Sequence, residues 1–117
     1  MAMYKVKITV IEKILHEHIA DKYLTDGKKV GSCDCFEVGD SFIADGMMAP
    51  PKNFCPFAWN DIFSTVLAIS RGGTFTPWDK TNFSHIACCT DGVRPVTFLI
   101  ERDEEMKFPG HSEDRAE

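Results

Sequence analysis

The segment HIACCTDGVRPVTF, residues 85–98, places two adjacent cysteines before an Asp-Gly pair and an arginine. Asp-Gly between two apolar runs is a strong signal for a β-hairpin with a two-residue turn. Such a turn would place Cys89 directly opposite Arg94. A cation at that distance stabilises a thiolate, so the spacing predicts a charge-tuned thiol. The alternative is that Arg94 pairs with Asp91 or with another carboxylate.

Strand alternation predicts that the two adjacent thiols point to opposite faces of the hairpin. Cys89 shares its face with apolar residues that we expect to meet the core, whereas Cys88 lies opposite Pro95 on the other face. Only one of the two thiols can therefore belong to a given site, and Cys88 does so only if both faces are buried or the turn carries a bulge. Because Pro95 lacks an N–H, its strand is expected at an edge or with one position unpaired.

The other three cysteines lie in predicted loops. Cys33 and Cys35 would point the same way in an extended segment, and a CxC pair supplies half of a soft-metal site. Cys55 precedes Pro56, which suits the first turn of a helix. A helix N-terminus favours negative charge and so stabilises a thiolate at Cys55, although the side chain can equally act as an apolar staple.

Three interpretations of the cysteines remain open. The first is a zinc or iron site, with Cys35 or a histidine as an additional ligand, although no CxxC pair is present. Its ligands would come from Cys33, Cys55, Cys88 and Cys89. The second is a reactive or redox thiol. Its residues would be Cys89, Arg94 and Cys55. The third treats the cysteines as small buried hydrophobes.

Aromatic residues offer a different kind of site. Trp59, Phe75 and Trp78 would line a pocket that captures a small molecule or a protein partner. Core or rim positions are the alternative for the two tryptophans. His18 falls on the apolar face of a predicted helix and is expected to be a core histidine, while His85 shares the hairpin face of Cys89.

Composition and charge restrict the classes of function. The chain has 117 residues, a net charge of −5 and five cysteines, which indicates one domain and argues against a nucleic-acid partner. It contains no apolar run long enough for a membrane helix and no signal-peptide pattern at its start, so we expect a cytosolic protein. An odd number of cysteines in a reducing compartment argues against a disulfide framework. Nucleotide-binding and common hydrolase motifs are absent from the sequence.

The elements that must position these residues follow from periodicity. Residues 4–12 alternate as a half-buried strand, a helix is expected over about 12–24, and residues 41–45 form a short strand. A buried helix begins at Pro56 and ends before Gly72, and the hairpin follows it. The order β-α-β-α-β-β predicts an α+β fold, a small antiparallel sheet packed with two helices. The domain would span residues 1–103, followed by an acidic, frayed tail over 104–117.

Four blocks carry a resemblance to a known group of proteins: GSCDCFEVGDSFIADG, NFCPFAWNDIF, GGTFTPW and ACCTDGVRPVTFLIER. The chain resembles, over residues 4–102, a widespread uncharacterised family of prokaryotic proteins of about a hundred residues. The Cys-Cys-x-Asp-Gly-x-Arg-Pro-Val block is its most distinctive part. The resemblance implies cysteine at the positions of Cys33, Cys55, Cys88 and Cys89. It implies none at Cys35, which favours Cys33 alone over a CxC metal pair.

The sequence thus predicts a small cytosolic domain with a cysteine-centred site. The site either binds zinc or iron or uses a reactive thiol in redox or accessory chemistry. The alternative is a non-enzymatic module that binds a small molecule or a protein through the aromatic pocket, with structural cysteines. Self-association as a homo-oligomer stays open, and the substrate is not specified.

Overall fold

The computed structural model describes residues 3–45 and 49–106, and within them the predicted order of elements is confirmed. One short 3-10 helix, η1, is added between the first helix and the second strand. The elements are β1 (Tyr4–Lys13), α1 (Glu17–Tyr23), η1 (Gly27–Val30), β2 (Ser41–Ala44), α2 (Pro56–Ser70), β3 (Ser84–Cys88) and β4 (Val96–Glu105). The fold class is α+β, as the periodicity predicts.

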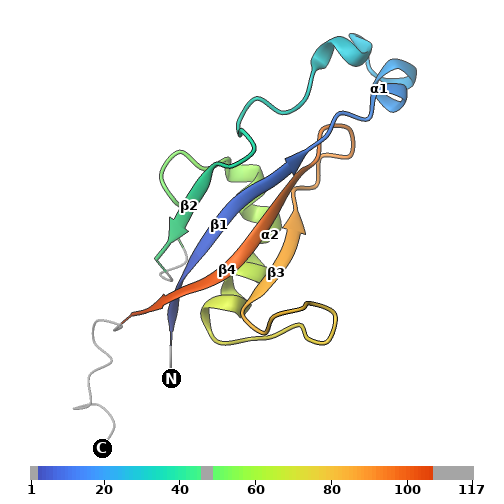
Figure 1. Cartoon of the computed structure of the whole chain (residues 1–117). Helices are drawn as coiled ribbons and strands as arrows, with labels where there is room; N and C mark the ends of the chain where they lie inside the picture. The colour runs from blue at the N-terminus through green and yellow to red at the C-terminus, as the bar shows by residue number, and fades with distance from the viewer. Residues whose placement is uncertain (1–2, 46–48, 107–117) are drawn as a thin grey trace, which may run out of the picture.

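The four strands form one antiparallel sheet in the order β2-β1-β4-β3 (Figure 1). The first and last strands of the chain are thus the two central ones. The expectation that the Pro95 strand lies at an edge is wrong, because β4 is central. Pro95 lies just before β4 begins, and its carbonyl accepts a hydrogen bond from the Ile14 amide at 3.1 Å. A proline at that place costs the sheet no ladder bond.

Helix α2 covers one face of the sheet, and the core lies between them (Figure 1). Alternation along β1 and β4 places every second side chain on this face, and apolar residues three or four apart on α2 meet them. The fully buried members of this layer are Val6, Ile8, Val10, Ile62, Val66, Ile69, Phe98 and Ile100. The opposite face of the sheet carries mixed residues and contains the exposed Ile43 and Ile86.

The hairpin between β3 and β4 is longer than a two-residue turn. Cys88 pairs with Thr97, and the Cys89 amide donates to the Val96 carbonyl at 3.1 Å. The predicted pairing of Cys89 with Arg94 is therefore wrong by two residues. A shift of two preserves the face of every side chain, so Cys89 still faces the core side and Cys88 still faces away.

The first strand is longer and the first helix shorter than their periodicity predicts. The register of β1 against β4 shifts between Val10 and Glu12, which marks a β-bulge at Ile11. Lys13 then lies opposite Val96, on the core face, although strict alternation would place it on the open face. The apolar residues that predict a helix from residue 12 owe their spacing to this bulge and to the turn that follows β1.

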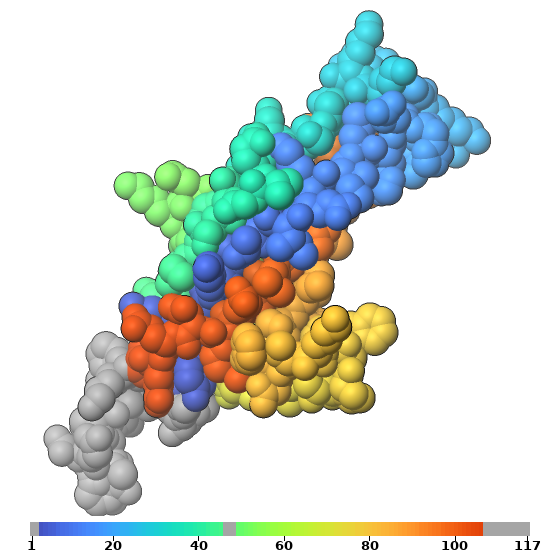
Figure 2. Space-filling view, viewed as in Figure 1, coloured from blue at the N-terminus to red at the C-terminus, as the bar shows by residue number. Residues whose placement is uncertain are grey.

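Residues 14–32, here called the arm, project from the end of the sheet and contain α1 and η1 (Figure 2). Their base is held by the His16 amide, which donates to the Val93 carbonyl at 2.9 Å. Only Ala20 of α1 is buried, while Tyr23 is 71% exposed. His18 is exposed, so its expected place in the core is wrong.

The sheet also fixes the end of the described chain. β4 continues to Glu105, and the Met106 amide donates to the Met3 carbonyl at 2.8 Å. Residues 104–106 of the predicted tail therefore pair with the start of the chain, and residues 107–117 lie outside the described residues. Across the described ranges, none of the helices is long and apolar enough to cross a membrane.

Candidate functional site

Four cysteines from three separate segments meet at one pocket of about 390 Å³, here called the thiol pocket. The segment after the arm, the start of α2 and the loop between β3 and β4 form its walls. Its lining residues are Cys33, Cys35, Phe36, Cys55, Phe57, Ala58, Asp61, Cys89, Thr90, Asp91, Arg94 and Val96. All five cysteines of the chain are free thiols.

Lys13 fixes the loop that carries Cys33 and Cys35. Its Nζ donates to the carbonyl oxygens of Cys33 at 2.9 Å and of Phe36 at 2.8 Å. The bulge in β1 turns this lysine under the loop, where its side chain is only 16% exposed. A further contact of 3.3 Å to the Glu37 carboxylate balances its charge. The lysine thus holds the first two thiols in place through their backbone.

Cys35 interacts with two other thiols. Desolvation, and then the nearby thiols of Cys33 and Cys55, raise the pKa of Cys35 to about 11. Although Cys35 as a whole residue is exposed, desolvation is the largest cause of its raised pKa, and the thiols of Cys33 and Cys55 add to it. The Cys35 amide also lies 3.4 Å from the Cys33 Sγ. Cys35 therefore keeps its proton at neutral pH.

Cys55 is the N-cap of α2, with Pro56 in the first turn as predicted. Its side chain makes no capping hydrogen bond, while its carbonyl accepts from the Trp59 amide at 2.9 Å. The Sγ instead interacts with the Cys35 thiol, at the positive end of a 15-residue helix. Cys55 also packs partly against the core, as the apolar alternative predicts.

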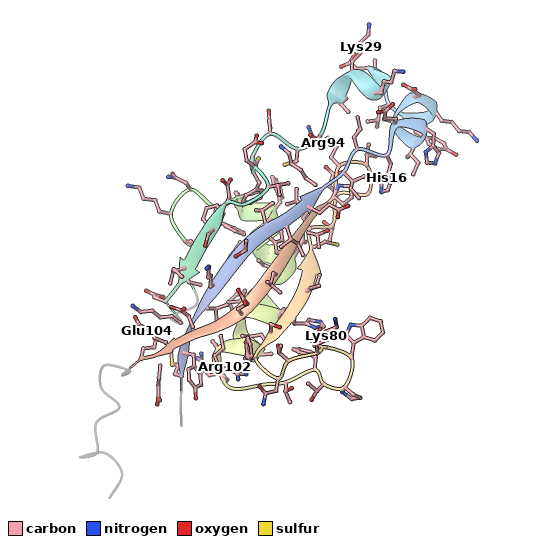
Figure 3. All side chains as sticks on the ribbon, in the orientation of Figure 1. His16, Lys29, Lys80, Arg94, Arg102 and Glu104 are labelled. Atoms are coloured by element: carbon pink, nitrogen blue, oxygen red, sulfur yellow. The ribbon has the colours of Figure 1, made fainter. Side chains whose placement is uncertain are left out.

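Cys89 and Arg94 line the thiol pocket, but each has another polar partner. The Cys89 Sγ lies 3.4 Å from the Val96 amide, and the Arg94 Nε lies 3.5 Å from the Asp91 carboxylate. The alternative that Arg94 pairs with Asp91 is the arrangement observed. Figure 3 shows Arg94 at the end of the sheet where the arm begins.

Asp91 organises the loop between β3 and β4. Its Oδ1 accepts the amides of Val93 at 2.9 Å and of Arg94 at 2.8 Å. Desolvation acts to raise the pKa of Asp91, but these two hydrogen bonds and the Arg94 charge outweigh it and lower the pKa below its usual value. The loop therefore carries a stable negative charge beside the guanidinium.

Asp61 joins α2 to the same loop. Its Oδ2 accepts from the Thr90 amide at 2.8 Å and from the Thr90 hydroxyl at 3.1 Å. This contact fixes the β3–β4 loop over the first turns of α2, and so sets the spacing between the Cys55 and Cys89 walls of the pocket.

Cys88 does not line the thiol pocket, because it is exposed on the opposite face of the sheet. Cys35, which the resemblance sets aside, takes its place. As arranged in residues 3–45 and 49–106, no group of three or more histidine, cysteine, aspartate or glutamate side chains is positioned to hold a metal ion. The four predicted ligands therefore do not form a zinc or iron site in this geometry.

The three residues of the predicted aromatic pocket lie in three different environments and do not line one pocket. Trp59 is 9% exposed and belongs to the core, and Trp78 is 85% exposed. Phe75 stacks on His85, with ring centres 4.0 Å apart. His85 Nδ1 in turn lies 2.7 Å from the Asp79 carboxylate, which ties the loop over residues 72–82 to β3. These contacts give Phe75 and His85 a structural role.

Sequence reasoning missed Lys13 and Thr90. Strict alternation places Lys13 on the open face, and only the bulge in β1 turns it to the core face. Thr90 reaches Asp61 because the β3–β4 loop is longer than a two-residue turn. Comparison of the chain with family models, curated proteins and solved structures finds no match. The function must therefore be argued from the chemistry of the thiol pocket.

Proposed function

We propose that the protein is a thiol-dependent redox module that exchanges disulfides through the thiol pocket, in a reducing compartment such as the cytosol. The observation that carries the proposal is the meeting of Cys33, Cys35 and Cys55, with the Cys35 thiol perturbed by the other two. Cys33, Cys55 and Cys89 pack against the core, yet together with Cys35 they also line an open pocket that a partner disulfide could enter. Free thiols, odd in number, fit such a compartment.

Cys55 is the attacking thiol in this proposal. It is partly exposed, lines the pocket and stands at the N-terminus of α2, where the helix favours the negative charge of a thiolate. The thiolate attacks one sulfur of a partner disulfide, R–S–S–R. A mixed disulfide of Cys55 with R forms, and the other half leaves as a thiolate that takes a proton from water.

Cys35 is the second thiol. Desolvation and the neighbouring thiols of Cys33 and Cys55 raise the pKa of Cys35, so Cys35 is the thiol that stays protonated until the first step has taken place. Once Cys55 enters a mixed disulfide, its charge is gone and one cause of that raised pKa disappears. Cys35 can then ionise and attack the Cys55 sulfur, releasing the second thiol. The balance is protein dithiol plus R–S–S–R giving protein disulfide plus two R–SH.

Exchange kinetics with bis(2-hydroxyethyl) disulfide test the proposal. The wild-type protein is expected to release two equivalents of 2-mercaptoethanol and to lose two thiols. Cys55→Ser should abolish the reaction, and Cys35→Ser should stop at a mixed disulfide that adds the mass of one mercaptoethanol less two hydrogens. Cys88→Ser is the matched control, since Cys88 lies outside the pocket, and should react as wild type does. Equal loss of rate in all three variants would contradict the assignment.

The metal content of the purified protein is a second test of the proposal. Because the thiols are not arranged as a metal site in the described residues, protein purified without oxygen should contain zinc and iron well below one equivalent. One equivalent of either metal that is lost in Cys35→Ser or Cys55→Ser would contradict thiol exchange as the function of the pocket. It would favour the metal hypothesis instead.

A further inference from the structure

A second hollow of about 370 Å³ adjoins the thiol pocket. It lies between the arm and the β3–β4 loop and is here called the arm hollow. Its lining residues are Leu24, Val30, Asp91, Val93 and Arg94. Asp91 and Arg94 also line the thiol pocket, so the two hollows share a wall. The two adjoining hollows, the one at the thiols and the one against the arm, are together called the groove.

The side chains of the arm hollow are suited to apolar contacts. Leu24 is 37% exposed although it is a large apolar residue, and Val30 and Val93 are only partly covered. At the other end of the groove, Phe57 is 80% exposed beside Cys55. An occupant that covered these side chains would remove their apolar surface from water, which favours binding. A small disulfide held at Cys55 would leave the arm hollow empty.

Charge in the groove disfavours an acidic occupant. Two carboxylates, Asp61 and Asp91, face it with a single guanidinium, Arg94, which is already paired with Asp91. The whole chain carries a net charge of −5. Small cellular thiols that bear carboxylates would meet repulsion here, whereas a neutral or basic polypeptide would not.

We propose that the partner disulfide belongs to a polypeptide, bound as an extended segment along the groove. Its cysteine would lie in the thiol pocket at Cys55. An apolar residue two or three positions away would lie in the arm hollow between Leu24 and Val93. An extended chain advances about 3.3 Å per residue, so two or three residues span adjoining hollows of this size. This inference rests on the proposed thiol exchange and adds the class of substrate.

The test compares two peptides of equal length, each joined through its cysteine to 2-mercaptoethanol in a mixed disulfide. One has leucine and valine on either side of the cysteine and the other has serine there. The wild-type protein should react about tenfold faster with the apolar peptide, since tenfold corresponds to about 1.4 kcal/mol of the apolar contact energy. Acid quenching and mass spectrometry of the protein give both rates.

Substitutions in the arm hollow test whether the faster reaction with the apolar peptide depends on the side chains that line the hollow. Leu24→Ser combined with Val30→Ser should remove the tenfold preference, and Val93→Thr, which keeps the side-chain shape, should reduce it. Tyr23→Ser is the matched control, because Tyr23 is 71% exposed on the arm and does not line the hollow. All these variants should react with bis(2-hydroxyethyl) disulfide as wild type does, which also shows that they fold.

Two results would overturn the inference, and they are distinguishable. If the small disulfide reacts normally but the two peptides react at equal rates, or the preference survives in the arm variants, the polypeptide substrate is wrong and thiol exchange stands. If even bis(2-hydroxyethyl) disulfide leaves all five thiols reduced, the proposed function itself is wrong, and the substrate inference with it.

Discussion

The protonation of Cys35 is the residue-scale property that matters most for the pocket. Its pKa of about 11 predicts slow alkylation near pH 8 and a rate that rises toward pH 11. Cys33→Ser and Cys55→Ser each remove a thiol that raises this pKa, so alkylation of Cys35 should begin at lower pH in both variants. Mass spectrometry of iodoacetamide-treated protein at a series of pH values measures the rate for each cysteine.

The same shift has a consequence for stability. A thiol with a raised pKa in the folded state favours folding while it is protonated, below its ordinary pKa of 9.0. That contribution is lost as the pH rises through about 11. Stability should therefore fall more steeply between these pH values in wild type than in Cys35→Ser. Parallel unfolding curves for the two proteins across this range would contradict the assignment of the raised pKa.

Asp91 gives a prediction of opposite sign. Its pKa is lowered in the folded state, so its stabilising effect is present above its ordinary pKa of 3.8 and is lost as the pH falls through the folded value. Asp91→Ala removes the acceptor of two backbone amides and should lower the free energy of unfolding at pH 7 by about 1 kcal/mol. Urea unfolding of the two proteins should show this difference shrinking below about pH 4. A difference that does not depend on pH would contradict it.

At the scale of elements, the bulge in β1 connects the sheet to the thiols. Lys13→Met keeps the length of the side chain but removes the donor to two loop carbonyls. The variant should lose about 1–3 kcal/mol of stability, because those carbonyls lose their partner. It should also alkylate faster at Cys35 as the loop loosens. Lys5→Met is the control, since the exposed Lys5–Glu104 pair should contribute little.

The C-terminal end of α2 depends on a residue of β4. Arg102 donates from Nε to the Ile69 carbonyl at 3.1 Å and from Nη2 to the Gly73 carbonyl at 2.7 Å. Arg102→Met should therefore destabilise the protein by about 1.5–3 kcal/mol, while Arg102→Lys should keep part of that energy. Thermal unfolding of the two variants measures the order. A lysine variant as unstable as the methionine one would mean that the fork of donors, rather than the charge, holds the helix end.

Sequence periodicity predicts the elements of this fold better than it predicts their contacts. Alternation in β1, the Pro56 start of α2 and the apolar face of α2 are local patterns, and each is observed. The observed register of β3 against β4 differs by two residues from the predicted one, because the strands are joined by a longer loop, which Asp91 stabilises, and not by a two-residue turn. The first helix is predicted to begin at about residue 12, whereas α1 begins at Glu17. The prediction is too early because the bulge at Ile11 gives the apolar residues a spacing like that of a helix. A bulge and a loop conformation depend on partners far along the chain, so neither is visible in a local pattern.

At the scale of the whole molecule, the sheet order explains why the cysteines meet. β1 ends and β4 begins at the same end of the sheet, where the arm leaves, α2 begins and the β3–β4 loop turns (Figure 1). The sequence alone can suggest that Cys33, Cys55 and Cys89 lie close together. The strand order brings their three segments to the same end of the sheet. The inclusion of Cys35 and the exclusion of Cys88 follow from which side chains face that edge.

If the pocket exchanges disulfides, Cys35 and Cys55 form a reversible redox pair. Equilibration of the protein in dithiothreitol buffers of graded potential, followed by trapping and peptide mapping, tests this directly. We expect one two-electron transition, a single disulfide that joins Cys35 to Cys55, and Cys88 free at every potential. Five thiols that stay reduced across the range, or a first disulfide that contains Cys88, would contradict it.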